Sequence, residues 1–78
     1  MVNILIADQS YVVASGLAEL LSTIKEVSDV KITTDGVECI KLIDSYNPHL
    51  IFINTSLLSA NEYEDFKQKI RFRRSERG

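Results

Sequence analysis

The stretch Val2-Asn3-Ile4-Leu5-Ile6-Ala7, which is followed at once by the polar pair Asp8-Gln9, decides the fold class of this chain. Its last four residues are all apolar, which is typical of a strand covered on both faces of a parallel sheet. A second apolar stretch, Leu50-Ile51-Phe52-Ile53, ends in Asn54-Thr55-Ser56. The two stretches predict buried strands, at about 2–7 and 50–54, with polar carboxyl ends.

Helical periodicity follows the first strand. Ser10 is a candidate helix N-cap, and the apolar residues after it recur at steps of three and four, as on one face of a helix. That face consists of Val13, Leu17, Leu20, Leu21 and Ile24. The shorter segment 30–34 alternates apolar with polar residues, which predicts a strand at a sheet edge.

Two capping boxes predict the remaining helices. Asp35 with Glu38 opens the second helix, and Asn47-Pro48 ends it because proline cannot continue the helical backbone. The apolar residues of this helix are Val37, Ile40, Leu42, Ile43 and Tyr46. Ser59 with Glu62 opens a third helix. Its apolar residues are Tyr63, Phe66 and Ile70.

Strand and helix alternate three times with short connections, which predicts parallel strands joined by right-handed crossovers. The 78 residues, of which 45% are hydrophobic, suffice for one α/β domain over residues 1–78. A basic tail covers about 67–78 and includes Arg71, Arg73, Arg74 and Arg77. Terminal charge runs are usually solvated, so we expect no nucleic-acid binding by this segment.

Composition narrows the class of protein. The net charge of -2 offers no broad electrostatic attraction to nucleic acid or to an anionic membrane. Cys39 is the only cysteine, so it forms no internal disulfide, and its apolar neighbours predict a buried thiol. Asp8 interrupts the first apolar stretch, and no stretch approaches the ~20 residues of a membrane-spanning helix. We therefore expect a cytoplasmic protein without a membrane partner.

Ligands of open parallel sheets bind beyond the carboxyl ends of the strands. Asp8 and Gln9 follow the first strand, whereas Asn54 and Ser56 follow the third, and we expect these residues to face each other if the two strands are neighbours. Such an arrangement would suit a cation or a phosphate. Asp8 and Asn54 could equally be turn residues without a ligand. His49 has no placed acid, cysteine or second histidine near it in sequence, which predicts an exposed loop residue.

Three segments together resemble the receiver domain of response regulators, with features of the LuxR/NarL family. These segments are 4–10, the Asp35-Gly36 turn with Glu38, and 47–54. The resemblance implies a three-layer flavodoxin-like (CheY-like) parallel sheet. The sheet would be incomplete, because the family continues through two further strands and helices. It also implies a role in two-component phosphorelay signal transduction and in transcription regulation.

The resemblance assigns roles to the polar strand ends. In the family, two acids after the first strand hold Mg²⁺, and an aspartate after the third accepts a phosphoryl group. By this match Asp8 keeps one acid, Gln9 replaces the other, and Asn54 takes the phosphoacceptor position. Ser56 would offer the backbone carbonyl that helps to hold the metal. An amide is a poor nucleophile and Mg²⁺ prefers charged oxygens, so we expect no phosphorylation of Asn54, no enzymatic activity, no cofactor and at most weak Mg²⁺ binding.

The same resemblance makes the third strand a surface for interaction. The strand is central in the family's order 2-1-3-4-5, whereas here it becomes an edge of Leu50, Ile51, Phe52 and Ile53. An uncovered apolar edge invites pairing with another chain. We expect a protein partner, which is a histidine kinase, another regulator, or a second copy in a homodimer or swapped oligomer.

Two alternatives remain. The chain could be the N-terminal fragment of a LuxR/NarL-type DNA-binding transcriptional regulator, whose DNA-reading part lies elsewhere. It could also be an enzyme with Asp8 as general base, which is the weaker alternative because no nucleophile, metal cluster or glycine-rich phosphate loop accompanies that residue.

Overall fold

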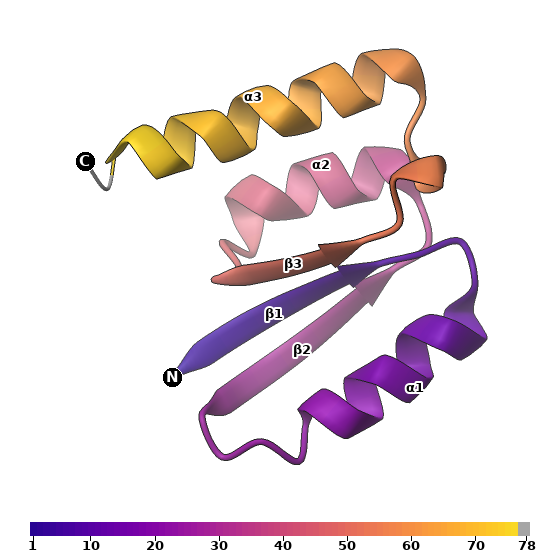
Figure 1. Ribbon diagram of the computed structural model, residues 1–78, viewed down its shortest axis with the longest axis vertical. Helices are drawn as coiled ribbons and strands as arrows, with labels where there is room; N and C mark the ends of the chain where they lie inside the picture. The colour runs from indigo at the N-terminus through magenta and orange to yellow at the C-terminus, as the bar shows by residue number, and fades with distance from the viewer. Residues whose placement is uncertain (77–78) are drawn as a thin grey trace.

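Three parallel strands form the central sheet of the computed structural model, which describes residues 1–76, with side chains as far as Ile70. The strands are β1 (Val2–Ala7), β2 (Val27–Thr33) and β3 (Leu50–Ile53), in the order β2-β1-β3. β1 is therefore central and pairs in parallel with both neighbours, as Figure 1 shows. Apolar residues on both faces of β1 explain why this strand has no polar alternation.

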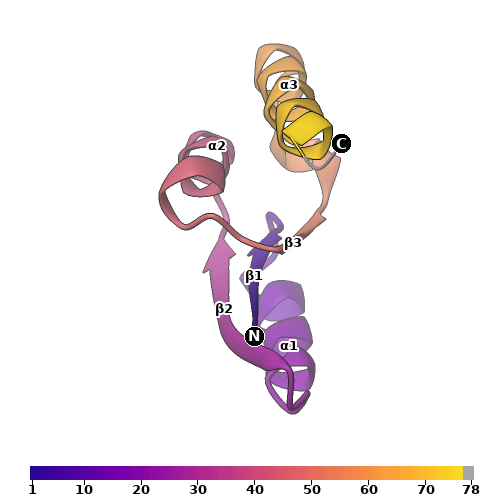
Figure 2. The same ribbon diagram turned by 90° about the vertical axis from the view of Figure 1, so that its left-hand side faces the viewer.

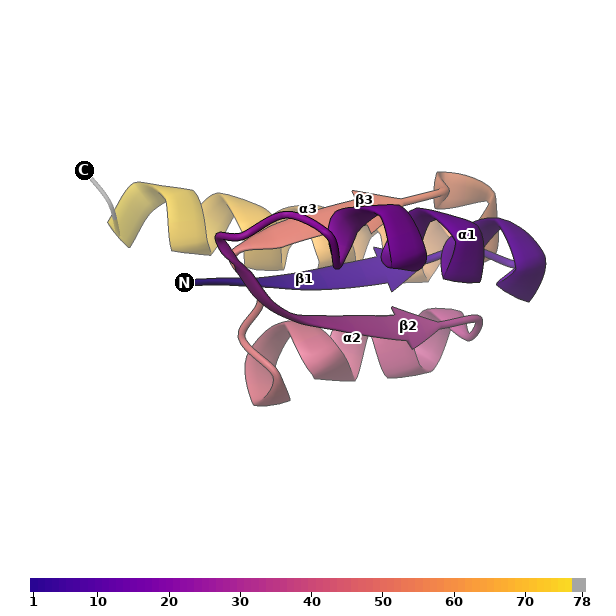
Figure 3. The same ribbon diagram turned by 90° about the horizontal axis from the view of Figure 1, so that it is seen from below.

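Helices cover both faces of the sheet. α1 (Tyr11–Leu21) lies on one face and α2 (Gly36–Ser45) on the other, as Figures 2 and 3 show. A short 3₁₀ helix, η1 (Thr55–Leu57), leads from β3 to α3 (Ala60–Glu76), which packs beside α2. The predicted fold class is confirmed, because this is an α/β flavodoxin-like arrangement with three layers, incomplete at three strands.

The core consists of two layers separated by β1. Ile4 and Ile6 pack against Ala14 on the α1 side, whereas Leu5 and Ala7 pack with Cys39 on the α2 side. These β1 residues are almost completely buried. The prediction that Cys39 is a small buried hydrophobe is confirmed.

The predicted apolar face of α1 is wrong in three positions. Val13 and Leu20 are exposed, and Ile24 lies beyond the end of the helix. The face that contacts the sheet is instead centred on Ala14 and Ala18, flanked by Leu17 and Leu21. Small side chains let the helix approach the sheet closely, and a pattern weighted toward large apolar residues overlooks them. Ser10 is the N-cap as predicted, and its hydroxyl accepts from the Val13 N–H at 3.3 Å.

The two predicted capping boxes differ in outcome. At α3, the Ser59 hydroxyl accepts from the Glu62 N–H at 3.2 Å and the Glu62 carboxylate accepts from the Ser59 N–H at 2.9 Å, so this box is confirmed. At α2, Asp35 accepts from the Glu38 N–H at 2.9 Å, but the Glu38 carboxylate accepts from the Thr33 hydroxyl and does not return to Asp35. Thr33 is buried and donates to that carboxylate, which explains the difference.

Several boundaries and exposures also differ from prediction. β2 begins three residues earlier than predicted, at Val27, and occupies a sheet edge as expected. β3 ends at Ile53, so Asn54 belongs to the following turn. On α2, Val37 is exposed, and Asn47 ends the helix with a φ of 55°, in the left-handed region.

The basic tail begins inside α3, where Lys67 and Lys69 lie within the helix. The side chains of Arg71, Arg73, Arg74 and Arg77 lie outside the described residues. None of the helices in the described part of the chain is long and apolar enough to cross a membrane.

Candidate functional site

The carboxyl ends of β1 and β3 lie side by side at one edge of the sheet. The Asn54 N–H donates to the Ala7 carbonyl at 2.9 Å, and the Asp8 N–H donates to the Thr33 carbonyl at 3.2 Å. The first bond brings the loop after β3 next to the end of β1, and the second ties the start of the loop after β1 to the end of β2. The four candidate residues Asp8, Gln9, Asn54 and Ser56 are thus collected in one place, which we call the strand-end site.

Asp8 forms a local turn within this site. Its Oδ1 accepts from the Ser10 N–H at 2.9 Å, two residues on, and this turn leads directly into the N-cap of α1. Aspartate commonly bonds to the backbone two residues ahead, where it starts a turn. The structure therefore gives Asp8 a local role that needs no ligand. The Asp8 side chain is half-buried.

Gln9 spans the site. Its Nε2 donates to the Ser56 carbonyl at 3.2 Å, across 47 positions of sequence. This carbonyl is the group that the receiver resemblance assigns to the metal. Here a neutral N–H donor reaches the oxygen, and the bond joins the β1–α1 loop to η1.

Asn54 organises the turn after β3. Its Oδ1 accepts from both the N–H and the hydroxyl of Ser56, at 3.1 and 2.8 Å, and so caps η1. A side-chain oxygen in this position satisfies a backbone donor that the short helix leaves open. The amide of Asn54 is thus engaged through its oxygen.

The donor set of the strand-end site does not fit Mg²⁺. Asp8 supplies the only carboxylate among its four residues, and Gln9 turns a partial positive N–H toward the carbonyl that would complete the set. Mg²⁺ needs near-octahedral oxygen ligands, usually with one or two carboxylates. Across the part of the chain with described side chains, no group of three or more His, Cys, Asp and Glu could hold a metal ion.

Close packing behind the site was not predicted from sequence. A Cβ built on Gly36 would lie 2.6 Å from Glu62 Oε1 and 2.9 Å from the Leu57 carbonyl oxygen. The start of α2 therefore touches both η1 and the cap of α3. Only the Asp35-Gly36 pair hinted at this contact, since glycine often marks a close approach of backbone.

Among the described residues, Cys39 and Tyr46 have shifted pKa values, and both lie outside the strand-end site. Burial raises the pKa of the Cys39 thiol from 9.0 to about 11, so the thiol stays protonated and unreactive at neutral pH. Burial, together with the hydrogen bond to Asp29, raises the pKa of Tyr46 from 10.0 to about 12. Tyr46 donates to Asp29 Oδ2 at 2.6 Å, and the Lys31 Nζ lies 5.4 Å from the centre of its ring. This cluster fastens α2 to β2.

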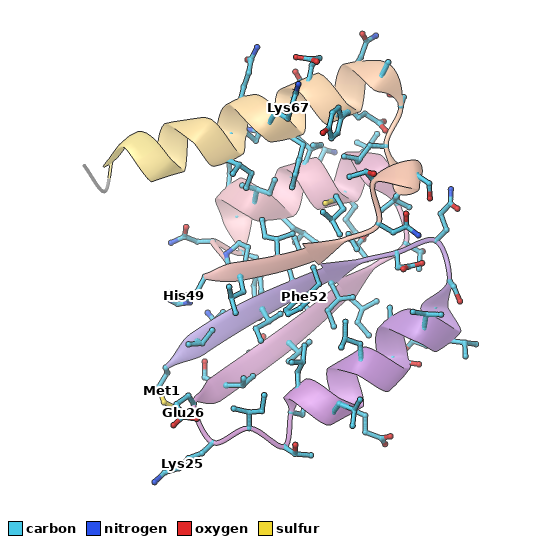
Figure 4. All side chains as sticks on the ribbon, in the orientation of Figure 1. Met1, Lys25, Glu26, His49, Phe52 and Lys67 are labelled. Atoms are coloured by element: carbon cyan, nitrogen blue, oxygen red, sulfur yellow. The ribbon has the colours of Figure 1, made fainter. Side chains whose placement is uncertain are left out.

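His49 has a structural role that sequence reasoning missed. It is exposed, as predicted, but its Nδ1 accepts from the Asn3 N–H at 3.0 Å and its own N–H donates to the Asn3 carbonyl at 2.8 Å. Figure 4 places His49 at the start of β3, at the same end of the sheet as Met1. The histidine therefore anchors the first residues of β3 to β1, far from the strand-end site.

Comparison with protein-family models, with curated proteins and with solved structures gives no match for this chain.

Proposed function

We propose that the chain is a receiver-like signalling module of the two-component type, which is not phosphorylated at Asn54 and acts through protein–protein contacts. The observation that carries the proposal is the bond from Gln9 to the Ser56 carbonyl. It joins the two loops whose relative position a bound metal and phosphoryl group set in a phosphorylated receiver. This hydrogen bond would then take the place of a switch.

The chemistry of the site supports a contact role without catalysis. Asn54 presents a neutral amide whose oxygen already accepts two hydrogen bonds from Ser56. An uncharged amide oxygen engaged in this way is a poor nucleophile. Asp8 is the only acid and holds the turn before α1. We infer that the strand-end site keeps the loops in one arrangement and that the outer surfaces of the sheet and helices make the functional contacts.

The direct test is incubation of the chain with acetyl phosphate and Mg²⁺, followed by mass spectrometry of the intact protein. The expected result is no added phosphoryl group, in either the presence or the absence of Mg²⁺. A stable acyl phosphate on the chain would overturn the proposal.

The matched variant Asn54→Asp restores a carboxylate at the position that the receiver resemblance assigns to the phosphoacceptor. In Asn54→Asp, a carboxylate oxygen can accept the same two bonds from Ser56, so the turn should persist. Chemical shifts of the Ser56 and Gln9 amides report on that turn. If the wild-type chain bound Mg²⁺ at micromolar concentration with shifts at Asp8 and Ser56, the Gln9 bond would not replace the metal, and the proposal would fail on that ground.

A further inference from the structure

The two outer edges of the sheet differ in their protection against pairing. β2 carries Ser28, Asp29 and Lys31 as exposed residues, whereas β3 is Leu-Ile-Phe-Ile throughout. Charged residues on an edge strand discourage the addition of another strand. Within the described sheet, the β3 edge is therefore the apolar and uncharged one, and no described strand pairs with its outer side.

The backbone of β3 presents hydrogen-bonding groups to that outer side. The His49 N–H donates to the Asn3 carbonyl, so the backbone of His49 faces β1. Successive residues of a strand direct these groups to opposite sides, and Leu50 and Phe52 therefore direct theirs outward. Unpaired backbone groups of this kind form a template for a further strand.

The side chains of the same two residues are also uncovered. In the register of the sheet, Leu50 lies beside Ile4 and Phe52 beside Ile6, on the face that α1 covers over β1. α1 packs mainly against β1 and β2 and leaves Leu50 and Phe52 of β3 largely uncovered. As a result Leu50 is 51% exposed. Phe52, which Figure 4 labels, is 40% exposed.

We propose that this edge pairs with the same edge of a second copy of the chain, in antiparallel orientation about a two-fold axis at Ile51. This pairing makes a second copy of the chain the partner of the proposed signalling module. It rests on the proposed function only for its role in signalling. A two-fold axis at Ile51 sets Leu50 opposite Phe52 of the second copy, and Phe52 opposite Leu50 of that copy. The outward backbone groups of both residues then form two hydrogen-bonded pairs in a six-stranded sheet.

The chain itself limits the register to this one. A shift in one direction would bring in Pro48, which has no N–H to donate. A shift in the other direction would bring in Asn54, whose N–H is already bonded to Ala7. The usable segment therefore runs from Leu50 to Phe52, and its midpoint is Ile51.

A second copy matches this edge in polarity and in charge. The two-fold axis places Leu50 and Phe52 of both copies on the same face, where four apolar side chains cover one another. α3 lies on the β3 side of the molecule, as Figures 1 and 2 show. Its described residues are acidic first, at Glu62, Glu64 and Asp65, and basic afterwards, at Lys67 and Lys69, which also pair with Glu64 and Asp44 of the same chain. Two copies of α3 in opposite directions are therefore complementary in charge.

The first experiment measures the mass of the full chain by analytical ultracentrifugation over a range of concentrations. We expect a reversible dimer. Phe52→Lys should raise its dissociation constant about ten-fold or more, because it removes two apolar cross-strand pairs and adds charge to the edge. The matched control is Val12→Lys, at a 79% exposed position on α1, which should leave the dimer intact. A monodisperse monomer at all concentrations, or equal dimerisation of both variants, would overturn the pairing.

A cross-linking experiment tests the register even if Phe52→Lys is unstable. In a Cys39→Ala background, Leu50→Cys and Phe52→Cys are prepared separately and oxidised alone and as a mixture. The expected result is a disulfide-linked dimer chiefly in the mixture, because residue 50 then lies opposite residue 52. Efficient linkage of either variant alone, or none in the mixture, contradicts this register. Phosphoryl uptake is measured separately, so a monomer that takes up no phosphoryl group would refute the pairing and leave the proposed function standing.

Discussion

The Gln9 Nε2 donates to the carbonyl oxygen of Ser56 at 3.2 Å and thereby joins the loop after β1 to the loop after β3. The bond runs from a side chain to a backbone carbonyl, and the two residues are 47 positions apart in the chain. An amide is suited to the contact because it supplies N–H donors without the charge of a lysine. The bond therefore holds the strand-end site together while leaving it neutral at that point.

Gln9→Glu should weaken the strand-end site. A carboxylate opposite the Ser56 carbonyl replaces a donor with an acceptor, so we expect the free energy of unfolding to fall by about 1 kcal/mol. Urea unfolding followed by circular dichroism measures the change. Gln68→Glu is the matched control on the exposed surface of α3, and it should shift stability by no more than about 0.5 kcal/mol.

Asn54→Ala should open the turn after β3. The substitution removes the oxygen that accepts from the Ser56 N–H and hydroxyl, and loss of such a cap costs about 1 kcal/mol. Asn54→Asp keeps an acceptor in place and should retain most of the stability. Equal losses in the two variants, measured by thermal unfolding, would show that the cap contributes little.

Gly36→Ala and Gly16→Ala should have opposite effects. A Cβ at Gly36 would meet the Leu57 carbonyl oxygen at 2.9 Å and Glu62 Oε1 at 2.6 Å, so we expect a loss of about 1–3 kcal/mol from overpacking. At Gly16, within α1, a Cβ would find nothing within 4 Å, and the better helix former should add about 1 kcal/mol. Denaturant midpoints for the two variants on opposite sides of the wild-type value would confirm the close approach at Gly36 and the open space at Gly16.

Stability should fall at alkaline pH. The pKa of Cys39 rises from 9.0 to about 11 on folding, and that of Tyr46 from 10.0 to about 12. Below pH 9 both groups are protonated in the folded and the unfolded chain. Above it, the unfolded chain loses these protons first, so the free energy of unfolding decreases until the folded values are passed.

Two variants separate the alkaline contributions. Cys39→Ala should flatten the decrease between about pH 9 and 11, and Tyr46→Phe the decrease between about pH 10 and 12. Urea unfolding at intervals of pH supplies the curves. Rapid alkylation of Cys39 in the folded chain at neutral pH would contradict the burial on which the first expectation rests.

The fold class could be predicted from the amino-acid sequence, because periodicity and the signals at helix and strand ends are local properties. The unbroken apolar run of β1, the alternation in β2, the serine N-cap of α1 and the Ser59 box of α3 each depend on neighbouring residues alone. Their order implies a parallel sheet with helices on both faces. The grouping of the polar strand ends followed from the same order.

The contacts between side chains far apart in the sequence could not be predicted in this way and are known from the three-dimensional fold. The buried face of α1 depends on how closely Ala14 and Ala18 approach the sheet, and the choice of Thr33 by Glu38 depends on a burial that sequence does not show. The Gln9–Ser56 bond, the approach of Gly36 to Leu57 and the uncovered edge at Phe52 arise for the same physical reason. Contacts between distant residues are set by the relative positions of whole elements, which no local pattern encodes.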